Sequence, residues 1–155
     1  IETLGYGNGY NGYRNDDRFR QGYGYRIDGD RHWGGGASYR YSYRGRYYET
    51  SDYGAQLLRN ALSFGYRQGV LAARAALSYR SGYDLRGCAG YRDGSYGYED
   101  GYIDQDQYSY YYRQGFERGY NEAYYGRYQY GYYRNGAVEV VADLLDLILD
   151  LRHIH

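Results

Sequence analysis

The fold is predicted most directly by the stretch ALSFGYRQGVLAA, which covers residues 61–73. Small residues recur in it at every fourth position and so share one side of a helix: Ala61, Gly65, Gly69 and Ala73. A glycine inside a helix costs about 1 kcal/mol relative to alanine, so the two glycines are a net loss unless another backbone approaches closely. The stretch therefore predicts a helix that packs along this ridge of small residues against a second helix.

The second helix is predicted by a repeat of the same pattern further along the chain. The tetrapeptide YRQG occurs at residues 66–69 and again at 112–115. The ridge of small residues there consists of Gly115, Gly119 and Ala123, and aromatic rings flank it at the same spacing. Arginine, glutamate and glutamine between the glycines indicate that the helices meet in water rather than in a membrane, where such ridges are best known. The alternative is a poorly helical low-complexity segment in which the spacing is accidental.

Three helices are predicted in all, over residues 52–79, 105–128 and 137–151. Ser51 or Asp52 can cap the first helix by accepting a hydrogen bond from a free amide of its first turn. Asn135 and Gly136 form a turn before the third helix. The predicted fold is therefore mainly α: a helical hairpin packed on Gly/Ala ridges plus a C-terminal amphipathic helix, together forming a domain over residues 51–155.

Residues 1–50 are rich in glycine, tyrosine and arginine and are predicted to form an extended arm before this domain. Within the arm, residues 38–48 alternate with a period of two, which places three tyrosines on one face of a strand: Tyr39, Tyr41 and Tyr43. A strand of this kind can add to the sheet edge of a neighbouring molecule. An extended loop on the surface is the alternative.

The predicted C-terminal helix has an apolar arc that is too wide for one shallow groove. The residues assigned to an interface on it are Val138, Val141, Leu145 and Ile148. An acidic stripe lies beside them and consists of Glu139, Asp143, Asp146 and Asp150. Because an arc of this width should be buried on at least two sides, the helix is expected to pack against adjacent subunits. Packing against the chain's own hairpin is the alternative.

The composition limits the classes of function. Tyrosine supplies 29 of the 155 residues and glycine 25, whereas leucine, isoleucine, valine and phenylalanine together supply 24. All 19 basic residues are arginine and balance 19 acidic residues, so no net charge attracts nucleic acid or an anionic membrane. The sequence contains no stretch of about 18 apolar residues, which excludes a transmembrane helix. Burial must come largely from aromatic rings.

No catalytic, cofactor, metal or small-molecule site can be assembled from the sequence pattern. Cys88 is the one cysteine and has no histidine base nearby in sequence, so we interpret it as a small buried residue, with an intermolecular disulfide as the alternative. His153 and His155 could bind a metal but are better explained as cationic groups that follow an acidic helix. The G-x-G-x-x-G match at residues 7–12 lacks the strand and helix of a nucleotide site and is interpreted as a turn cluster. We therefore expect no enzymatic activity and no cofactor.

Two motifs carry a resemblance to other proteins: GYRQG at residues 65–69 and, after a Tyr/Asp/Gly linker, YRQGFERGY at 112–120. Over about residues 55–126 the chain resembles a group of uncharacterised secreted proteins of Acidobacteria, from which it departs in lacking lysine and proline. The resemblance implies export to the cell envelope or the exterior, and it implies no known activity. Since the chain begins at Ile1 rather than at methionine, we expect a removed leader or a start further downstream.

Two classes of function remain for a neutral chain rich in tyrosine and arginine. In single-stranded nucleic-acid binders, tyrosines stack on bases and arginines meet phosphates. In self-associating chains, guanidinium groups stack on phenol rings, with about 0.5–2 kcal/mol for each contact. Because acidic residues equal the arginines in number, we expect a secreted structural protein that assembles with copies of itself into an extracellular filament or an envelope layer. Single-stranded nucleic-acid binding is the alternative.

Overall fold

The computed structural model describes residues 37–154, with the side chains of residues 142–144 left out. Within this range the chain divides into two compact units. The first unit comprises residues 37–55, 100–104 and 150–154, and the second comprises 56–99 and 105–149. The described residues contain four helices and five strands. The fold is therefore mixed rather than mainly α as predicted, because two segments expected to be extended or helical form β-hairpins.

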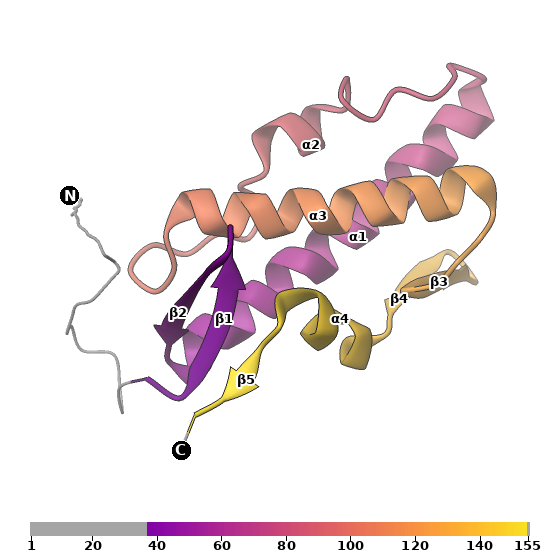
Figure 1. Ribbon diagram of the computed structural model, residues 1–155. Coiled ribbons are helices and arrows are strands. Elements are labelled where there is room, and N and C mark those ends of the chain that lie inside the picture. The colour runs from indigo at the N-terminus through magenta and orange to yellow at the C-terminus, as the bar shows by residue number, and fades with distance from the viewer. Residues whose placement is uncertain (1–36, 155) are drawn as a thin grey trace. The chain divides into compact units, whose positions relative to one another are not determined.

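The first unit contains a three-stranded sheet with the order β2-β1-β5 (Figure 1). Strand β1 (Tyr39–Tyr43) pairs antiparallel with β2 (Arg46–Thr50) on one side and with β5 (Arg152–His153) on the other. The turn between β1 and β2 has φ angles of 50° at Arg44 and 79° at Gly45. A two-residue hairpin turn needs such positive φ angles, because they match the right-handed twist of the two strands. Strand β1 thus covers only the first part of the strand predicted over residues 38–48.

The prediction of an extended arm is wrong for residues 39–50, and so is the alternative of a surface loop over 38–48. Arg44 and Gly45 reverse the chain, so that the second half of the alternating pattern pairs with the first half. The remainder of the predicted arm, with the turn cluster at residues 7–12, lies outside the described residues, as does His155.

The second unit is built on two long helices, α1 (Asp52–Tyr79) and α3 (Gln105–Tyr125). Helix α1 has the predicted bounds, and it begins at a capping serine, because the Ser51 hydroxyl accepts a hydrogen bond from the Gly54 amide at 3.1 Å. Helix α3 ends three residues earlier than predicted. Its end is set by Gly126, whose φ of 68° belongs to the left-handed region that glycine adopts without strain.

Four glycines bring the backbones of α1 and α3 into direct contact. A Cβ atom at each would overlap a carbonyl oxygen of the other helix; the pairs are Gly65 with Tyr112, Gly69 with Phe116, Gly115 with Leu62 and Gly119 with Tyr66. The hydrogen in place of each Cβ therefore points at that oxygen, as in the weak Cα–H···O bonds of close helix pairs. The other ridge residues, Ala61, Ala73 and Ala123, are buried.

The register of these contacts corrects the predicted hairpin in one respect. Contacts on α3 advance from Tyr112 to Phe116 as those on α1 advance from Gly65 to Gly69, so the two helices run parallel. Figure 1 shows α3 crossing α1 in this sense. The long linker makes a parallel pair possible, since residues 80–99 return along α3. They carry the short helix α2 (Ala89–Asp93), whose Tyr91 ring lies 5.7 Å from that of Phe116.

The predicted helix over 137–151 is wrong in its first part and too long at its end. Strand β4 (Ala137–Val140) pairs antiparallel with β3 (Gly131–Arg134), and only then does helix α4 (Ala142–Leu149) begin. The dipeptide Asn135-Gly136 has φ angles of 54° and 78°, the geometry of a tight hairpin turn. The β-branched valines that follow fit an alternating strand better than a helix.

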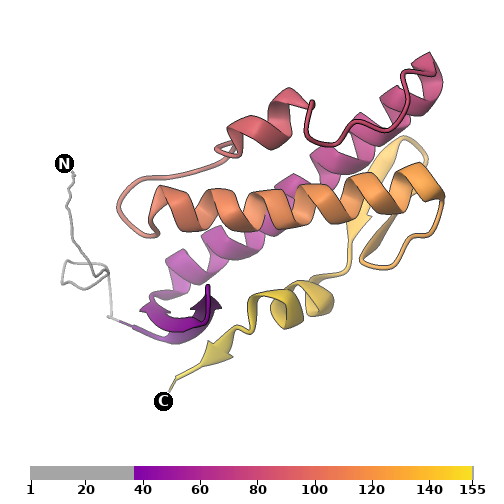
Figure 2. The ribbon, with the colours of Figure 1, turned by 45° about the horizontal axis from the view of Figure 1, so that its top comes forward.

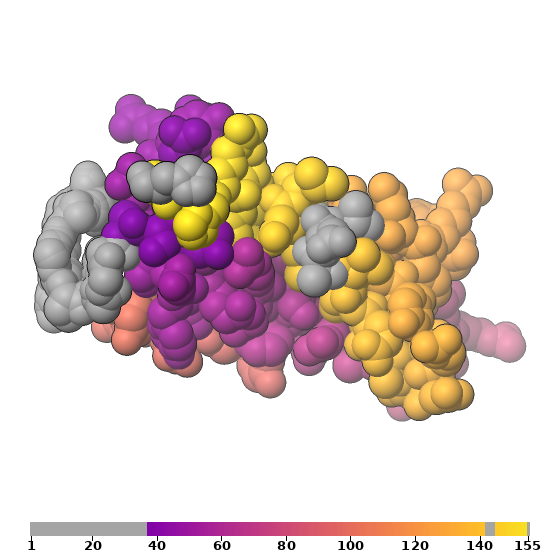
Figure 3. Space-filling model, turned by 90° about the horizontal axis from the view of Figure 1, so that it is seen from below, coloured from indigo at the N-terminus to yellow at the C-terminus, as the bar shows by residue number. Residues whose placement is uncertain are grey.

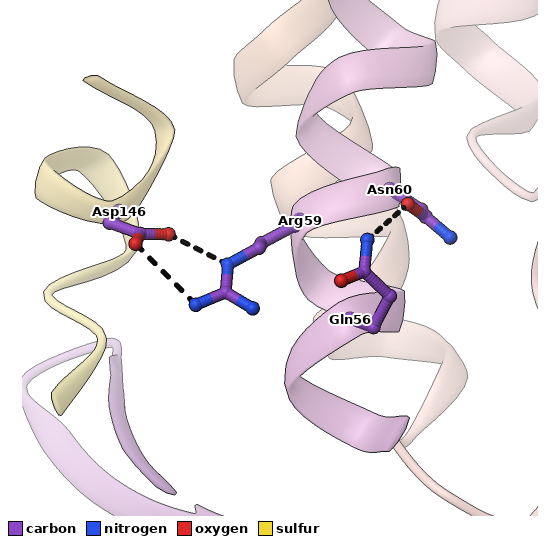
Figure 4. Close-up of polar contacts among 4 residues, drawn as sticks. All are labelled: Gln56, Arg59, Asn60 and Asp146. Atoms are coloured by element: carbon purple, nitrogen blue, oxygen red, sulfur yellow. Dashed lines mark hydrogen bonds and ion pairs between the residues drawn. The ribbon is translucent and has the colours of Figure 1, made fainter. Parts of the chain in front are cut away.

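Helix α4 packs on α1 within the second unit. Leu145 and Leu149 are buried, and the guanidinium of Arg59 makes two hydrogen bonds to the Asp146 carboxylate, at 2.8 and 3.4 Å (Figure 4). The space-filling view of Figure 3 shows α4 and the β3–β4 hairpin together on one face of this unit. The outward side of α4 carries Leu147, which is 74% exposed.

Candidate functional site

Several exposed apolar residues of the second unit lie at and near the C-terminal end of α1. Ala73 is the last buried residue of this helix, and no position from 74 to 79 is buried. Leu77 is 46% exposed and Tyr79 is 81% exposed. Figure 2 shows the last turns of α1 extending past α3. The helix therefore presents an apolar end that α3 does not cover.

The helix ends in a turn that returns the chain toward α3. The Ser81 amide donates to the Ala76 carbonyl at 3.0 Å, and the Arg80 amide donates to the Leu77 carbonyl at 3.3 Å. This pair of bonds is the Schellman pattern, in which the residue after the helix adopts a left-handed conformation. That residue is Arg80, with a φ of 56°. The turn places Tyr83 against α3.

Tyr83 is held by several contacts with α3. Its ring lies 5.1 Å from that of Tyr120 and 5.3 Å from that of Tyr124, both edge to face, and it stacks on Tyr125 at 6.1 Å. Its hydroxyl donates to Oδ1 of Asn121 at 2.5 Å. Partial burial, and then the neighbouring Tyr125, raise the pKa of Tyr83. The ring is thus fixed and neutral at ordinary pH, and one side of it remains exposed.

We call this region the distal surface. It consists of Leu71, Ala75, Leu77, Tyr79, Tyr83 and Tyr125, all of which are exposed. On α1, Leu71, Ala75 and Tyr79 share one side of the helix, whereas Leu77 lies on the side that continues the ridge from Ala73. Several exposed apolar residues gathered at one end of a helix mark an interaction site more often than a scattered exposed leucine does. Arg74 borders it, and its guanidinium lies 3.7 Å from the centroid of the Tyr133 ring. The distal surface is therefore apolar and aromatic, with a cation at its border that already has an aromatic partner.

The interface residues predicted from the sequence lie elsewhere, and the chain itself covers part of their surface. Tyr41 and Leu145 are buried, whereas Tyr39, Tyr43, Val138 and Ile148 are half-buried and Val141 is exposed. Tyr39 packs edge to face on His153 at 5.0 Å, and Tyr41 stacks on Tyr48 at 5.8 Å. The three tyrosines belong to the first unit and the four aliphatic residues to the second.

Sequence reasoning missed the distal surface, although a signal for it is present. The small-residue ridge of the second helix ends at Ala123, and that helix stops at Tyr125. The contact register pairs Gly69 with Phe116 and Tyr120, so the ridges of the two helices end side by side at Ala73 and Ala123. Past its ridge α1 continues to Tyr79, whereas α3 stops at Tyr125. Comparing these lengths would have shown that the last turn of α1 has no helix to pack against.

A buried carboxylate in this unit has a structural role. Glu122 accepts hydrogen bonds from the Tyr66 hydroxyl at 2.6 Å and from the amides of Gln129 and Tyr130 at 2.8 and 3.1 Å. Burial, and then the bond to Glu122, raise the pKa of Tyr66. Because these donors engage the carboxylate, Glu122 orders the turn between α3 and β3 rather than acting as a free acid or base.

Other reactive residues in the described range form no site. Burial, and then the charge of Asp84, raise the pKa of Cys88, which disfavours a thiolate nucleophile. Within residues 37–154, no three His, Cys, Asp or Glu side chains lie together as a metal site would need. No helix in that range is both long and apolar enough to cross a bilayer.

Comparison with protein-family models, with curated proteins and with solved structures finds no match for the chain. The resemblance to secreted proteins of Acidobacteria stays a prediction. A function is therefore inferred from the geometry of the distal surface.

Proposed function

We propose that this chain is a structural protein that associates with copies of itself through the distal surface, as the subunit of a filament or layer outside the cell or in its envelope. One observation carries the proposal: α1 is fully buried at Ala73 and then continues for two turns with Leu77 and Tyr79 uncovered. A helix end that served only the chain's own fold would not need apolar residues there.

The size of the surface sets the strength of the contact. Fully burying a leucine yields about 1.5–3 kcal/mol, whereas association costs an estimated 4–15 kcal/mol in lost freedom of motion. Leu71 and Leu77 are already about half buried, so together they still offer only roughly 1.5–3 kcal/mol, which does not offset that cost. The tyrosine rings of the distal surface must therefore be buried with them. A single contact of this kind is weak, and a stable assembly requires several contacts per subunit.

A second copy of the chain fits this surface better than a nucleic acid does. The chain has equal numbers of basic and acidic residues, so no net field steers a polyanion toward it. Guanidinium groups of the second unit also stack on the chain's own phenols, as Arg74 does on Tyr133 and Arg118 does on Tyr130 at 4.7 Å.

Sedimentation velocity over a concentration series tests the proposal. Wild-type protein should show concentration-dependent association that high salt barely changes, because burial of apolar surface is not screened. The double variant Leu77→Gln, Tyr79→Gln should remain monomeric with unchanged helix content by circular dichroism. Leu147→Gln is the matched control, since Leu147 is an exposed leucine on α4 outside the distal surface.

Three outcomes would overturn the proposal. The first is a wild-type protein that stays monomeric throughout the series. The second is a double variant that associates as the wild type does while Leu147→Gln abolishes association, which would move the interface to α4. The third is association that occurs only with an added single-stranded oligonucleotide and disappears in high salt, which would favour nucleic-acid binding.

A further inference from the structure

Two exposed tyrosines of the first unit are in ring contact although they are far apart in sequence. Tyr53 lies in the first turn of α1, and Tyr102 lies in the loop that precedes α3. Their ring centroids are 4.6 Å apart, with an angle of 58° between the planes. Tyr53 is 45% exposed and Tyr102 is 38% exposed. Both phenols are therefore accessible to a reagent in solution while they touch each other.

This geometry is close to that of a joined pair of phenols. Two directly bonded phenyl rings have a similar centroid separation and are twisted about the bond between them. We propose that Tyr53 and Tyr102 form an oxidative cross-linking site, at which a one-electron oxidant such as a haem peroxidase with hydrogen peroxide joins the two rings as dityrosine. The site does not depend on self-association, since both rings belong to one molecule.

The reaction balances with hydrogen peroxide as the final oxidant. Each phenol gives one electron and one proton to the oxidant and becomes a phenoxyl radical. The two radicals combine by a carbon–carbon bond between the ring positions next to the hydroxyls. Each of those carbons then loses its hydrogen as a proton while the phenol oxygen regains one, which restores both aromatic rings. One hydrogen peroxide takes up the two electrons and two protons and leaves as two waters.

Four other tyrosines of the described range each lack a condition that this pair meets. Tyr66, Tyr108 and Tyr112 are buried, and burial raises the pKa of each, so neither an oxidant nor a proton acceptor reaches them readily. Tyr96 is exposed, but its ring neighbour at 5.3 Å is Phe64, which has no hydroxyl to oxidise. Both rings of the Tyr53–Tyr102 pair are exposed and each has a second phenol in contact, a combination shared by the more widely separated Tyr83–Tyr125 pair.

The Tyr83–Tyr125 pair provides an internal comparison. Both rings are exposed, but they stack at 6.1 Å with nearly parallel planes, and the Tyr83 hydroxyl donates to Asn121. Stacked faces hold the reacting ring carbons apart. Coupling at this pair should be slower than coupling between Tyr53 and Tyr102.

The experiment treats dilute, monomeric protein with peroxidase and hydrogen peroxide and then digests it with trypsin. Cleavage after arginine releases Tyr53 in peptide 47–59 and Tyr102 in peptide 93–113. Mass spectrometry should find these peptides joined with the loss of two hydrogens, and fragment ions should place the bond at Tyr53 and Tyr102. The product should show dityrosine fluorescence. Its melting temperature should rise on the order of 10 °C, because the bond closes a long loop in the unfolded chain.

Tyr102→Phe keeps the ring packing but removes the phenol, so the yield of the joined peptides should fall at least tenfold. Tyr53→Phe should do the same. Tyr96→Phe changes an exposed tyrosine of the same tryptic peptide and should leave the yield unchanged. The proposal is overturned if Tyr102→Phe leaves the yield of joined peptides as it was, or if protein unfolded in urea couples this pair as efficiently as the folded protein does.

Discussion

The α1–α3 pair and the segment from β3 to α4 are held by different means, although both belong to the second unit. In the helix pair, backbone meets backbone at four glycines, and rings such as Tyr66 and Tyr112 are almost completely buried. The C-terminal segment is held by two buried leucines and by an ion pair whose side chains are 28% and 42% exposed. In the helix pair an added Cβ atom at any of these glycines would overlap a carbonyl oxygen of the other helix. In the C-terminal segment, α4 buries apolar side chains on one side and leaves Leu147 exposed on the other.

This difference explains why the sequence predicts the helix pair more accurately than it predicts residues 137–151. In the helix pair all local sequence signals agree: the i, i+4 ridge, the flanking rings and the cap each favour a helix. In residues 137–151 a strand pattern of valines and a helix pattern of leucines follow each other without a break. The turn at Asn135-Gly136 decides between them, since it pairs the valines with β3.

The largest expected effect comes from adding one methyl group to the helix contact. Gly119→Ala should lower the free energy of unfolding by about 4 kcal/mol, above the typical 1–3 kcal/mol for an overpacked core, because the new Cβ would overlap the Tyr66 carbonyl oxygen, which cannot rotate away. Urea denaturation measures the change. At Gly90 a Cβ would lie 3.4 Å from the Phe116 ring, so Gly90→Ala should change stability by less than 1 kcal/mol. Equal effects of the two substitutions would contradict the backbone contact.

A smaller loss is expected in the C-terminal segment. Leu149→Ala should cost about 3 kcal/mol, since Leu149 is completely buried and large-to-small substitutions in a core cost about 2–5 kcal/mol. Leu147→Ala, two residues away on the exposed side of α4, should change stability by less than about 0.5 kcal/mol. Both values come from urea denaturation. A Leu147 effect as large as that of Leu149 would mean that α4 is covered on both sides.

Alkaline pH should weaken the helix pair through its buried phenols. Burial raises the pKa of Tyr112 from the ordinary value of 10.0 to about 12 and raises the pKa of Tyr66 and Tyr108 as well. The folded state thus holds these protons more tightly than the unfolded state. Stability is therefore full below pH 10 and falls above it. At pH 10.5 the loss should be about 0.8 kcal/mol for each tyrosine, or about 2.5 kcal/mol together.

Substitution separates this effect from general alkaline repulsion. In Tyr112→Phe, the difference in stability between about pH 9 and pH 10.5 should shrink by about 0.8 kcal/mol. Leu149→Ala, which also lowers stability but removes no phenol, should leave it unchanged. The same pH dependence in both variants would show that the buried phenols do not cause it.

The smallest effect is expected at the ion pair that joins α4 to α1. Arg59 and Asp146 are both partly exposed, and pairs of this kind contribute about 0–1 kcal/mol. A double-mutant cycle with Arg59→Gln and Asp146→Asn should give a coupling energy of about 0.5 kcal/mol that decreases in high salt. A coupling energy several times larger would show that charge, rather than the two buried leucines, holds the segment.

Much of the fold could be predicted because its periodic patterns are local. The bounds of α1, the cap at Ser51 and the strand at 39–43 follow from residues within a few positions of one another. Residues 39–50 show the limit of this reasoning. Their alternation is present in the sequence, but the reversal at Arg44-Gly45 depends on an arginine in a left-handed conformation, which arginine rarely favours without a paired strand.

The candidate site was predicted less well than the fold. Tyr41 and Leu145 have the residue types of an interface, but the chain buries them itself. Leu77 follows the ridge residue Ala73 by four positions, as a buried residue of the helix pair would, but it is 46% exposed. Residue type and spacing define which face of a helix is apolar. Whether that face is exposed depends on where the neighbouring helix ends, and that helix is distant in sequence.

The sequence by itself determined that two helices would meet on glycine ridges, because interior glycines in a helix are stable only where another backbone approaches. Only the tertiary structure decided that these helices run parallel, that the valines after Gly136 pair with β3, and that α1 extends beyond α3. The reason is physical: a ridge has the same spacing in either direction. The return path of the linker sets the relative direction of the two helices. The surfaces that remain to be buried once the glycines are in contact decide how β3 and β4 pair and how much of α1 is left uncovered.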